Sequence, residues 1–272
     1  MNFKLVRIGI AAVPVCVLGI YIGAWARPMR RETTAAMRRP VIVELFTAEG
    51  CSSCPPADTL LAKLAELQPV RDAEVIPLEE HVDYWNDGGW IDQFSSYEWT
   101  ARQKDYVNRL KAQTAYTPQM VVDGESQFVG SNGPEALKAI AQAAEAPNVP
   151  VEIATDSAGS EKEPRFNVKV GPLGDAGAGD QAEVWLAVTE DGLHSDVTGG
   201  ENAGHELHHS AVVRVLHKLG AAVAGKSPVS FQDEAAVKLK SDWKRENLRV
   251  VVFVQEKKTL RIIGAASAKI AG

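Results

Sequence analysis

A pair of cysteines between a buried strand and an amphipathic helix constrains most strongly how this chain folds. Residues 41–46 form a nearly unbroken apolar run, which is typical of a parallel strand covered on both faces. After a four-residue turn come Cys51 and Cys54, separated by two serines. Pro55 and Pro56 then open a segment with leucines at helical spacing. The sequence therefore predicts a strand, a C-x-x-C turn and a helix in direct succession.

The position of these cysteines at the start of a helix favours redox chemistry. Free backbone N–H groups and the positive end of the helix dipole stabilise a thiolate there. We expect Cys51 to be the attacking sulfur and Cys54 to resolve the mixed disulfide from the same turn. Two other interpretations stay open from the residues alone, namely an inert structural disulfide and half of a metal site.

Further elements follow in a regular order in the first half of the chain. We predict a strand over about residues 75–82 and a helix over residues 98–113. Asp123-Gly124 between two β-prone runs predicts a hairpin turn, and Asn132 is expected to cap a last helix.

The order of these elements resembles the thioredoxin fold, which we predict as an α/β domain over residues 41–147. The resemblance implies that the Thr117–Pro118 bond is cis, and that Pro118 lies beside the dithiol, shields it from metals and positions substrate. It implies that the backbone of Thr117 pairs with an extended substrate. It also implies a buried proton acceptor in the first strand, a place that Glu44 holds one residue farther from the first cysteine than in thioredoxins.

Three longer motifs narrow the resemblance. They are the segment 44–58 around the dithiol, the run from His81 to Trp85, and the segment 116–124. In these motifs the chain resembles the DUF1223 family of secreted thioredoxin-like proteins, a family whose function is undefined.

Polar and aromatic residues gather after the second predicted strand, at the edge where open α/β sheets place their ligands. We therefore expect His81 and Trp85 to line the dithiol cleft and to contact substrate together with Thr117. His81 would shuttle protons there or join the cysteines as a metal ligand. The alternative is a loop packed by its own aromatic side chains, with His81 as a structural residue.

The second half, residues 148–272, has a different pattern of residues. Short alternating strands separated by Gly- and Pro-rich turns predict an antiparallel, sandwich-like β-rich domain. Its one chemical signal is the run from His205 to His209, which matches the letters of a zinc-protease motif. That motif needs a helix, whereas the flanking glycines and valines favour loop and strand. We interpret this domain as a platform for docking.

The amino terminus has the pattern of an export signal. Two cations precede an uncharged apolar run over residues 8–26, which closes with small residues. We predict that residues 1–26 are either a cleaved signal peptide or a signal anchor that holds the chain to the membrane, and that residues 27–40 are a basic linker. The expected location is the periplasm or the cell exterior.

The net charge of -6, from 29 Lys and Arg against 35 Asp and Glu, argues against a nucleic-acid partner. The leading hypothesis is an exported oxidoreductase that exchanges protein thiols and disulfides through Cys51 and Cys54. No organic cofactor is implied, because the cysteines themselves cycle, and no metal is assigned. The alternatives are a protein that handles copper or another soft metal with the same cysteines, and a non-catalytic binding module with a structural disulfide.

Overall fold

The computed structural model describes Met1 and residues 38–156, 158–174, 181–224 and 228–270. Its contacts group the chain into two units, Met1–Ala36 and Met37–Gly272, and the fold below is that of the second unit. The predicted signal segment and most of the predicted linker lie outside the described residues. Within the described residues, none of the helices has the length and apolar character that a membrane span requires.

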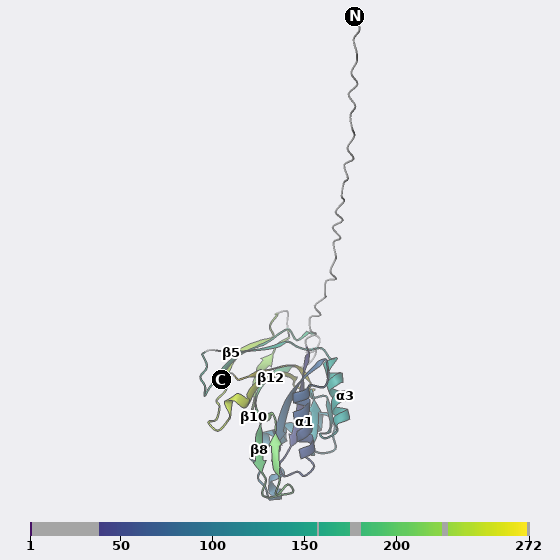
Figure 1. The fold of residues 1–272 in the computed structure, drawn as a ribbon, viewed down its shortest axis with the longest axis vertical. Helices are drawn as coiled ribbons and strands as arrows, with labels where there is room; N and C mark the ends of the chain where they lie inside the picture. Colours follow the sequence, from purple (N-terminus) through teal and green to yellow (C-terminus); the bar gives the residue numbers. More distant parts are fainter. Residues whose placement is uncertain (2–37, 157, 175–180, 225–227, 271–272) are drawn as a thin grey trace. The chain divides into compact units, whose positions relative to one another are not determined.

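An eight-stranded mixed sheet forms the centre of the fold (Figure 1). Its strands are β1 (Arg39–Thr47), β2 (Ala73–His81), β3 (Gln119–Val122), β4 (Ser126–Val129), β7 (Ala182–Glu190), β10 (Val212–Ala222), β12 (Leu248–Glu256) and β13 (Ile262–Lys269). Their order is β13-β12-β7-β10-β2-β1-β3-β4. The neighbours β1 and β2 are parallel, as are β2 and β10, which meet at the pair of Glu79 with Val212. The other neighbouring strands are antiparallel.

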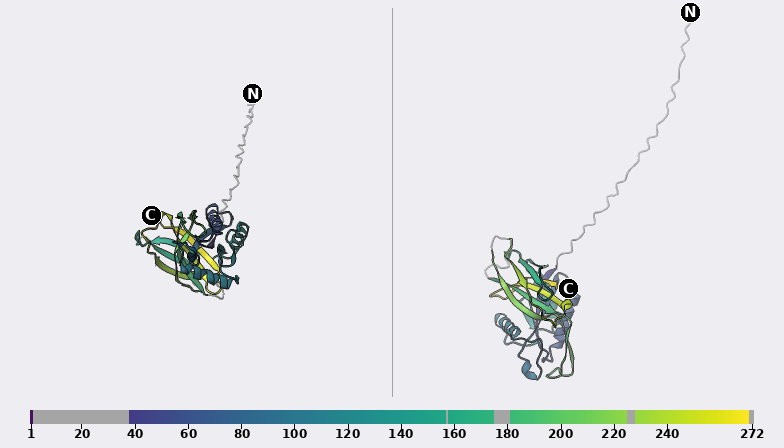
Figure 2. Two further views of the ribbon diagram at one scale, coloured as in Figure 1. Left: turned by 90° about the horizontal axis from the view of Figure 1, so that it is seen from below. Right: turned by 90° about the vertical axis from the view of Figure 1, so that its left-hand side faces the viewer.

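In the part of the chain that the structure describes, three α-helices cover this sheet, namely α1 (Pro55–Leu67), α2 (Tyr97–Arg109) and α3 (Gly133–Ala144). Helices α1 and α3 lie side by side and share an apolar core with Val41 and Val43 of β1 (Figure 2). Trp99 of α2 packs instead with Ile42 of the same strand. Successive residues of a strand point to opposite faces, so α2 covers the face opposite to α1 and α3.

Smaller elements complete the fold. They are a three-stranded sheet of β5 (Val151–Asp156), β6 (Arg165–Val170) and β11 (Phe231–Ala236), a hairpin of β8 (Leu193–Asp196) and β9 (Glu206–His209), and the 3-10 helices η1 (Asn86–Gly88) and η3 (Arg245–Asn247). The three-stranded sheet packs against the large one, because Phe166 and Val168 share an apolar core with Leu186 and Val250.

Local sequence signals located the elements of the first half. The helix predicted after the cysteines begins at Pro55, and the side chain of Asn132 caps α3. Asp123 and Gly124 form the hairpin turn with φ values of 45° and 68°, in the left-handed region that an Asp-Gly turn adopts. These predictions are confirmed.

The predicted fold class is wrong: the chain is not an α/β thioredoxin-like domain followed by an antiparallel, sandwich-like domain. One mixed sheet takes four strands from each half of the chain. The apolar core that holds Ile42 and Trp99 also holds Ala187 and Phe253. The physical reason lies at the end of β2, where the backbone N–H of Glu79 needs an acceptor. The carbonyl oxygen of Ala211, just before β10, accepts that hydrogen bond, and β10 thereby joins the sheet instead of closing a second sandwich. Periodicity along the sequence does not report such distant pairing.

Candidate functional site

A disulfide joins Cys51 and Cys54 at the start of α1. Cys54 is the N-cap of the helix, and its carbonyl oxygen accepts hydrogen bonds from the backbone N–H groups of Ala57 and Asp58. Both cysteines are fully buried in a core that also contains Phe46 of β1. The predicted succession of strand, C-x-x-C turn and helix is therefore confirmed.

A loop from the second half of the chain holds this turn from outside. The carboxylate of Glu201 accepts hydrogen bonds from the backbone N–H and the hydroxyl of Ser52, at 3.1 and 2.7 Å. The side-chain amide of Asn202 donates to the carbonyl oxygens of Glu49 and Cys51, at 2.8 and 3.0 Å. These bonds tie the β8–β9 connection to the dithiol turn.

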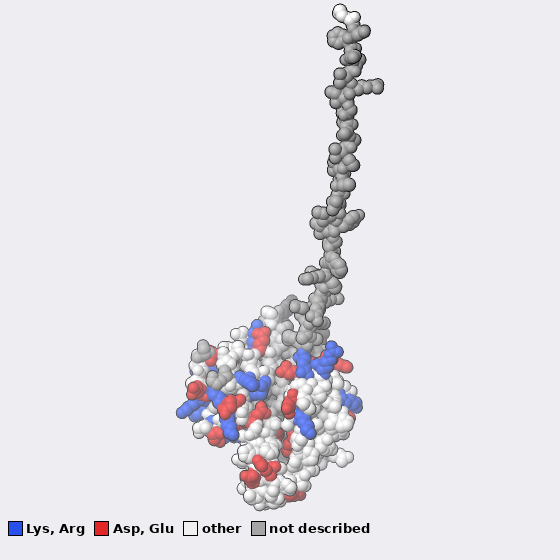
Figure 3. Space-filling model, in the orientation of Figure 1, with Lys and Arg blue, Asp and Glu red and all other residues white. Residues whose placement is uncertain are grey.

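The β8–β9 hairpin that carries this loop is acidic at its surface. Asp196, Glu201 and Glu206 are all exposed. In Figure 3 the end of the protein where β8 lies shows Asp and Glu side chains and no Lys or Arg on the visible face. The dithiol turn therefore lies next to a negatively charged surface.

Three of the predicted site residues, Trp85, Thr117 and Pro118, are close together. The indole N–H of Trp85 donates to the hydroxyl of Thr117 at 2.8 Å, and the Thr117–Pro118 bond is cis, as the resemblance implied. Trp85 also packs against the core that contains both cysteines. A Cβ on Gly50 would lie 3.3 Å from the Cβ of Trp85, so the glycine permits this close packing against the turn.

Glu44, the predicted proton acceptor, lies in a buried network of its own. Its two carboxylate oxygens accept hydrogen bonds from Nε of Arg102 and from the hydroxyl of Tyr106, both at 2.5 Å. Burial, together with the charge of Glu44, raises the pKa of neighbouring Glu80 well above its ordinary value. Arg102 is thus the cation between two carboxyl groups, since it also lies 3.5 Å from Glu80.

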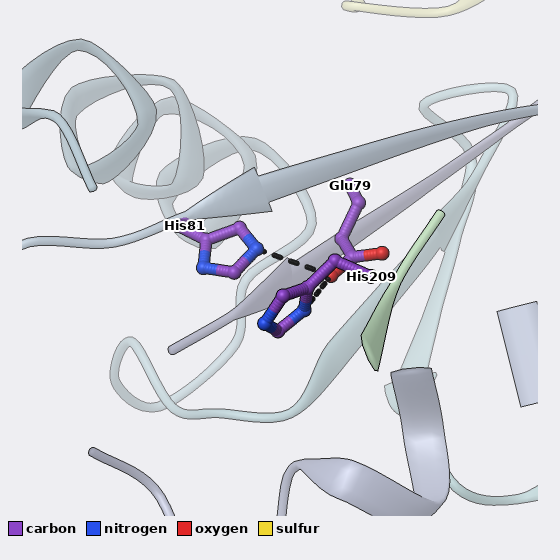
Figure 4. A group of neighbouring side chains, drawn as sticks. All are labelled: Glu79, His81 and His209. Atoms are coloured by element: carbon purple, nitrogen blue, oxygen red, sulfur yellow. Dashed lines mark hydrogen bonds and ion pairs between the residues drawn. The ribbon is translucent and has the colours of Figure 1, made fainter. Parts of the chain in front are cut away.

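His81 lies in a cluster of buried ionisable side chains, which we call the histidine–carboxylate cluster: Glu49, Glu79, His81, Asp92 and His209. Nδ1 of His81 is 2.7 Å from Oδ2 of Asp92, and its Nε2 is 3.1 Å from Oε1 of Glu79. Nδ1 of His209 is 2.7 Å from the same Glu79 oxygen, and its Nε2 is 3.4 Å from Oε1 of Glu49. Figure 4 shows both imidazole rings directed at Glu79.

Separate parts of the chain contribute to this cluster. Glu79 and His81 are two residues apart on β2, so both side chains lie on one side of the strand. His209 comes from β9, in which His209 is buried and its neighbour His208 is exposed. The expectation that this run is loop and strand instead of helix is confirmed, and strand β9 excludes the helical zinc-protease motif. Glu49 precedes the cysteines, and Asp92 follows η1.

The cluster holds opposite charges against one another. Burial favours neutral histidines, but the Asp92 carboxylate and then Glu79 hold the pKa of His81 well above its ordinary value. Burial also lowers the pKa of His209, but the carboxylates of Glu49 and Glu79 outweigh it and raise that pKa to about 9. Despite burial, hydrogen bonds from His209 and His81 lower the pKa of Glu79 to about 2. Imidazolium cations and carboxylates therefore stabilise each other out of contact with solvent.

Asp58 is a further buried carboxyl group, one helical turn after Cys54. It accepts a hydrogen bond from the hydroxyl of Thr47 at 2.7 Å. Burial, and then the negative charge of Glu79, raise the pKa of Asp58 to about 7. Such a group exchanges its proton near neutral pH, which suits acid–base chemistry.

Of the histidine–carboxylate cluster, only His81 is among the residues that the sequence assigns to the site. The available signal was the Glu79-Glu80-His81 run at the end of a strand that is otherwise mostly buried. Charged side chains in such a strand need partners, because unpaired buried charges are costly. The sequence does not identify His209 as that partner, since 130 positions separate it from Glu79.

The sequence model of the DUF1223 family, described as a protein of unknown function, matches residues 42–255. Among solved structures, protein AGR_C_4864 from Agrobacterium tumefaciens is similar at 25% identity and a TM-score of 0.61, covering 86% of this chain and 96% of that chain. HBP35 of Porphyromonas gingivalis is similar in fold at 17% identity and a TM-score of 0.63, covering 87% and 76%. No curated protein matches the sequence.

Proposed function

Because the chain belongs to the DUF1223 family, whose function is undefined, we propose from the site itself that it is a thiol–disulfide oxidoreductase acting on protein thiols or disulfides. The observation that carries the proposal is the disulfide of Cys51 and Cys54 at the first turn of α1. The helix start favours the thiolate form on which exchange depends. A buried carboxyl group on the same helix, Asp58, supports the proposal.

The exchange step uses the oxidised pair as follows. A substrate thiolate attacks Sγ of Cys51, and the bond to Cys54 breaks, so that Cys54 leaves with the electron pair. Asp58 gives its proton to that sulfur. A second substrate thiolate then attacks the substrate sulfur of the mixed disulfide and releases Cys51. The substrate gains a disulfide and the cysteines gain two electrons; the reverse sequence reduces a substrate disulfide.

Substrate access requires the turn to open, because both sulfurs are buried. The loop that binds Ser52 through Glu201 is the segment to move. Its bonds from Glu201 lie at the surface, and the buried bonds from Asn202 to the carbonyl oxygens of Glu49 and Cys51 would break as well. Trp85 packs against the turn and donates a hydrogen bond to Thr117, and in this proposal both residues contact the incoming chain, with Pro118 positioning it. We include export in the proposal, because the amino terminus has a signal pattern and disulfides form in oxidising compartments.

A redox titration of the full chain tests the proposal, with alkylation and mass analysis of the peptide that contains Cys51 and Cys54. A potential above about -270 mV is expected for an exchange-competent pair, whereas one below about -300 mV would mark a structural disulfide and end the proposal. For intermediate potentials, turnover of a protein disulfide decides. Turnover should disappear in Cys51→Ser and persist in Cys16→Ser, the matched control outside the pair.

A further inference from the structure

The side chains of Glu79, His81 and His209 converge as the ligands of a metal ion do. One ligand atom from each lies within 4.8 Å of the others, and the nearest nitrogens of the two histidines are 3.1 and 2.7 Å from one Glu79 oxygen (Figure 4). Two imidazole nitrogens and a carboxylate oxygen are an established donor set for zinc. We propose that these three residues bind a divalent transition-metal ion, with Zn²⁺ as the representative.

The outer nitrogens of both histidines support this assignment. Nδ1 of His81 faces Asp92 at 2.7 Å, and Nε2 of His209 faces Glu49 at 3.4 Å. Histidines that bind metals almost always direct their second ring nitrogen at a carboxylate or carbonyl, which orients the ring. Each histidine here has a carboxylate behind it and presents its opposite nitrogen to Glu79.

Two buried atoms in the cluster lack a hydrogen-bond partner, which gives an independent observation. They are Nε2 of His209 and Oε1 of Glu49, whose side chains are 1% and 0% exposed. Their separation of 3.4 Å is too long for a good hydrogen bond. An ion on Nδ1 of His209 would place the ring proton on Nε2, directed at Glu49, and a small rotation would then satisfy both atoms.

The charges of the cluster also fit a cation. Glu49, Glu79 and Asp92 place three carboxylates in a site closed to solvent. Without an ion, the two imidazolium rings supply the positive charge that these buried carboxylates require. A divalent ion would displace the ring protons that face Glu79 and supply that charge in their place. Zinc ligands lie about 2.0–2.2 Å from the ion and therefore about 3.3–3.6 Å from one another in a tetrahedral site. The Glu79 oxygen and the two nitrogens, now 2.7 and 3.1 Å apart, would separate by less than about 1 Å to admit the ion.

The site requires neither cysteine. Its ligands come from β2 and β9, so an ion would join the β8–β9 hairpin to the central sheet. The same hairpin carries Glu201, which contacts the dithiol turn. The inferred role is therefore structural, holding that loop in place over the turn, and it stands apart from the proposed redox function.

The test uses the full chain without an affinity histidine tag, with its disulfide intact and its metals removed by a chelator. Titration with Zn²⁺ by calorimetry should give one ion per chain. Titration with Co²⁺ should produce the visible absorption of a four-coordinate ion, with the three side chains and one water molecule as ligands. The double substitution of Cys51→Ser and Cys54→Ser should leave both results unchanged while abolishing thiol exchange, so failure of either proposal can be recognised without the other.

Three variants locate the ion. His209→Gln should abolish binding, and Asp92→Asn, which alters only the support of His81, should weaken it about 10- to 100-fold. His208→Gln is the matched control, because His208 is the adjacent residue on β9 and its side chain is 74% exposed. If His209→Gln does not fold, Asp92→Asn and the wild-type titration decide. The proposal is wrong if folded wild-type protein binds no Co²⁺, if His209→Gln binds normally, or if the cysteine substitutions remove the ion.

Discussion

The dithiol turn and the histidine–carboxylate cluster are neighbouring buried sites that are assembled in opposite ways. The turn is four consecutive residues between β1 and α1, and its bond joins positions three apart. The cluster brings together β2, β9, the segment before the cysteines and the loop after η1. A site built from adjacent residues can be recognised in the sequence even though distant segments hold it in place, whereas a site built from distant segments exists only in the folded chain.

Glu49 connects the two sites. Its side chain faces His209, and its carbonyl oxygen accepts a hydrogen bond from Asn202, which also binds the carbonyl of Cys51. Experiments that break one site while the other is observed can therefore show how far the two are coupled.

The largest expected effect comes from removing the central carboxylate of the cluster. In metal-free protein, Glu79→Ala should lower the free energy of unfolding by about 3–5 kcal/mol, because it leaves two buried imidazoles without their shared anion. Denaturant unfolding measures this. Glu74→Ala, an exposed glutamate on the same strand, should change stability by no more than about 0.5 kcal/mol. A loss below about 1 kcal/mol for Glu79→Ala would show that the cluster contributes little to folding.

A pH-dependent effect of the next size is expected at Asp58. Its pKa in the folded chain is about 7 against an ordinary value of 3.8. Between these values the unfolded chain releases the proton and the folded chain keeps it, so the stability of metal-free protein falls as pH rises from about 4 to 7. Asp58→Asn should remove the contribution of Asp58 to this loss of stability, which is a few kcal/mol at most.

Thermal unfolding of both proteins from pH 4 to pH 8 measures this effect. The stability advantage of Asp58→Asn over wild type should grow across that range, while the exposed Asp87→Asn should give a constant difference. Parallel curves for wild type and Asp58→Asn would contradict the prediction.

Reducing the disulfide should lower the free energy of unfolding by less than disrupting the histidine–carboxylate cluster does. A loop closed between Cys51 and Cys54 restricts few residues, so reduction should lower the free energy of unfolding by about 2 kcal/mol. Denaturant unfolding with and without a reductant gives this value, and Cys16→Ser checks that the third cysteine has no part in it. A loss on reduction larger than that of Glu79→Ala would reverse the comparison between the two sites.

The smallest effect is kinetic and concerns the loop that holds the turn. Glu201→Ala removes the acceptor for the backbone N–H and hydroxyl of Ser52, so dithiothreitol should reduce the disulfide about two- to fivefold faster. Quenching samples with an alkylating agent at timed intervals measures the rate of reduction. Glu206→Ala, exposed on the same hairpin, should reduce at the wild-type rate. An unchanged rate in Glu201→Ala would show that this contact does not limit access to the sulfurs.

Much of the local structure followed from short sequence signals. The prolines after Cys54 mark the start of α1, and Asp123-Gly124 and Asn132 mark a turn and a cap, because each signal acts through backbone groups within a few residues. The strand order of the central sheet could not be predicted from such signals, since the pairing of β2 with β10 joins residues in different halves of the chain.

The position of the dithiol turn followed from the sequence, because the strand, the two cysteines and the prolines that mark it are adjacent in the chain. The bonds that Glu201 and Asn202 make to this turn did not follow, since both residues come from the second half. That one sheet unites both halves, and that His209 meets Glu79 and His81, became evident only in the folded chain. Strand pairing and buried charge compensation depend on which distant segments come into contact, and local periodicity carries no information about that choice. The buried cluster therefore became visible only once β9 was placed beside the end of β2.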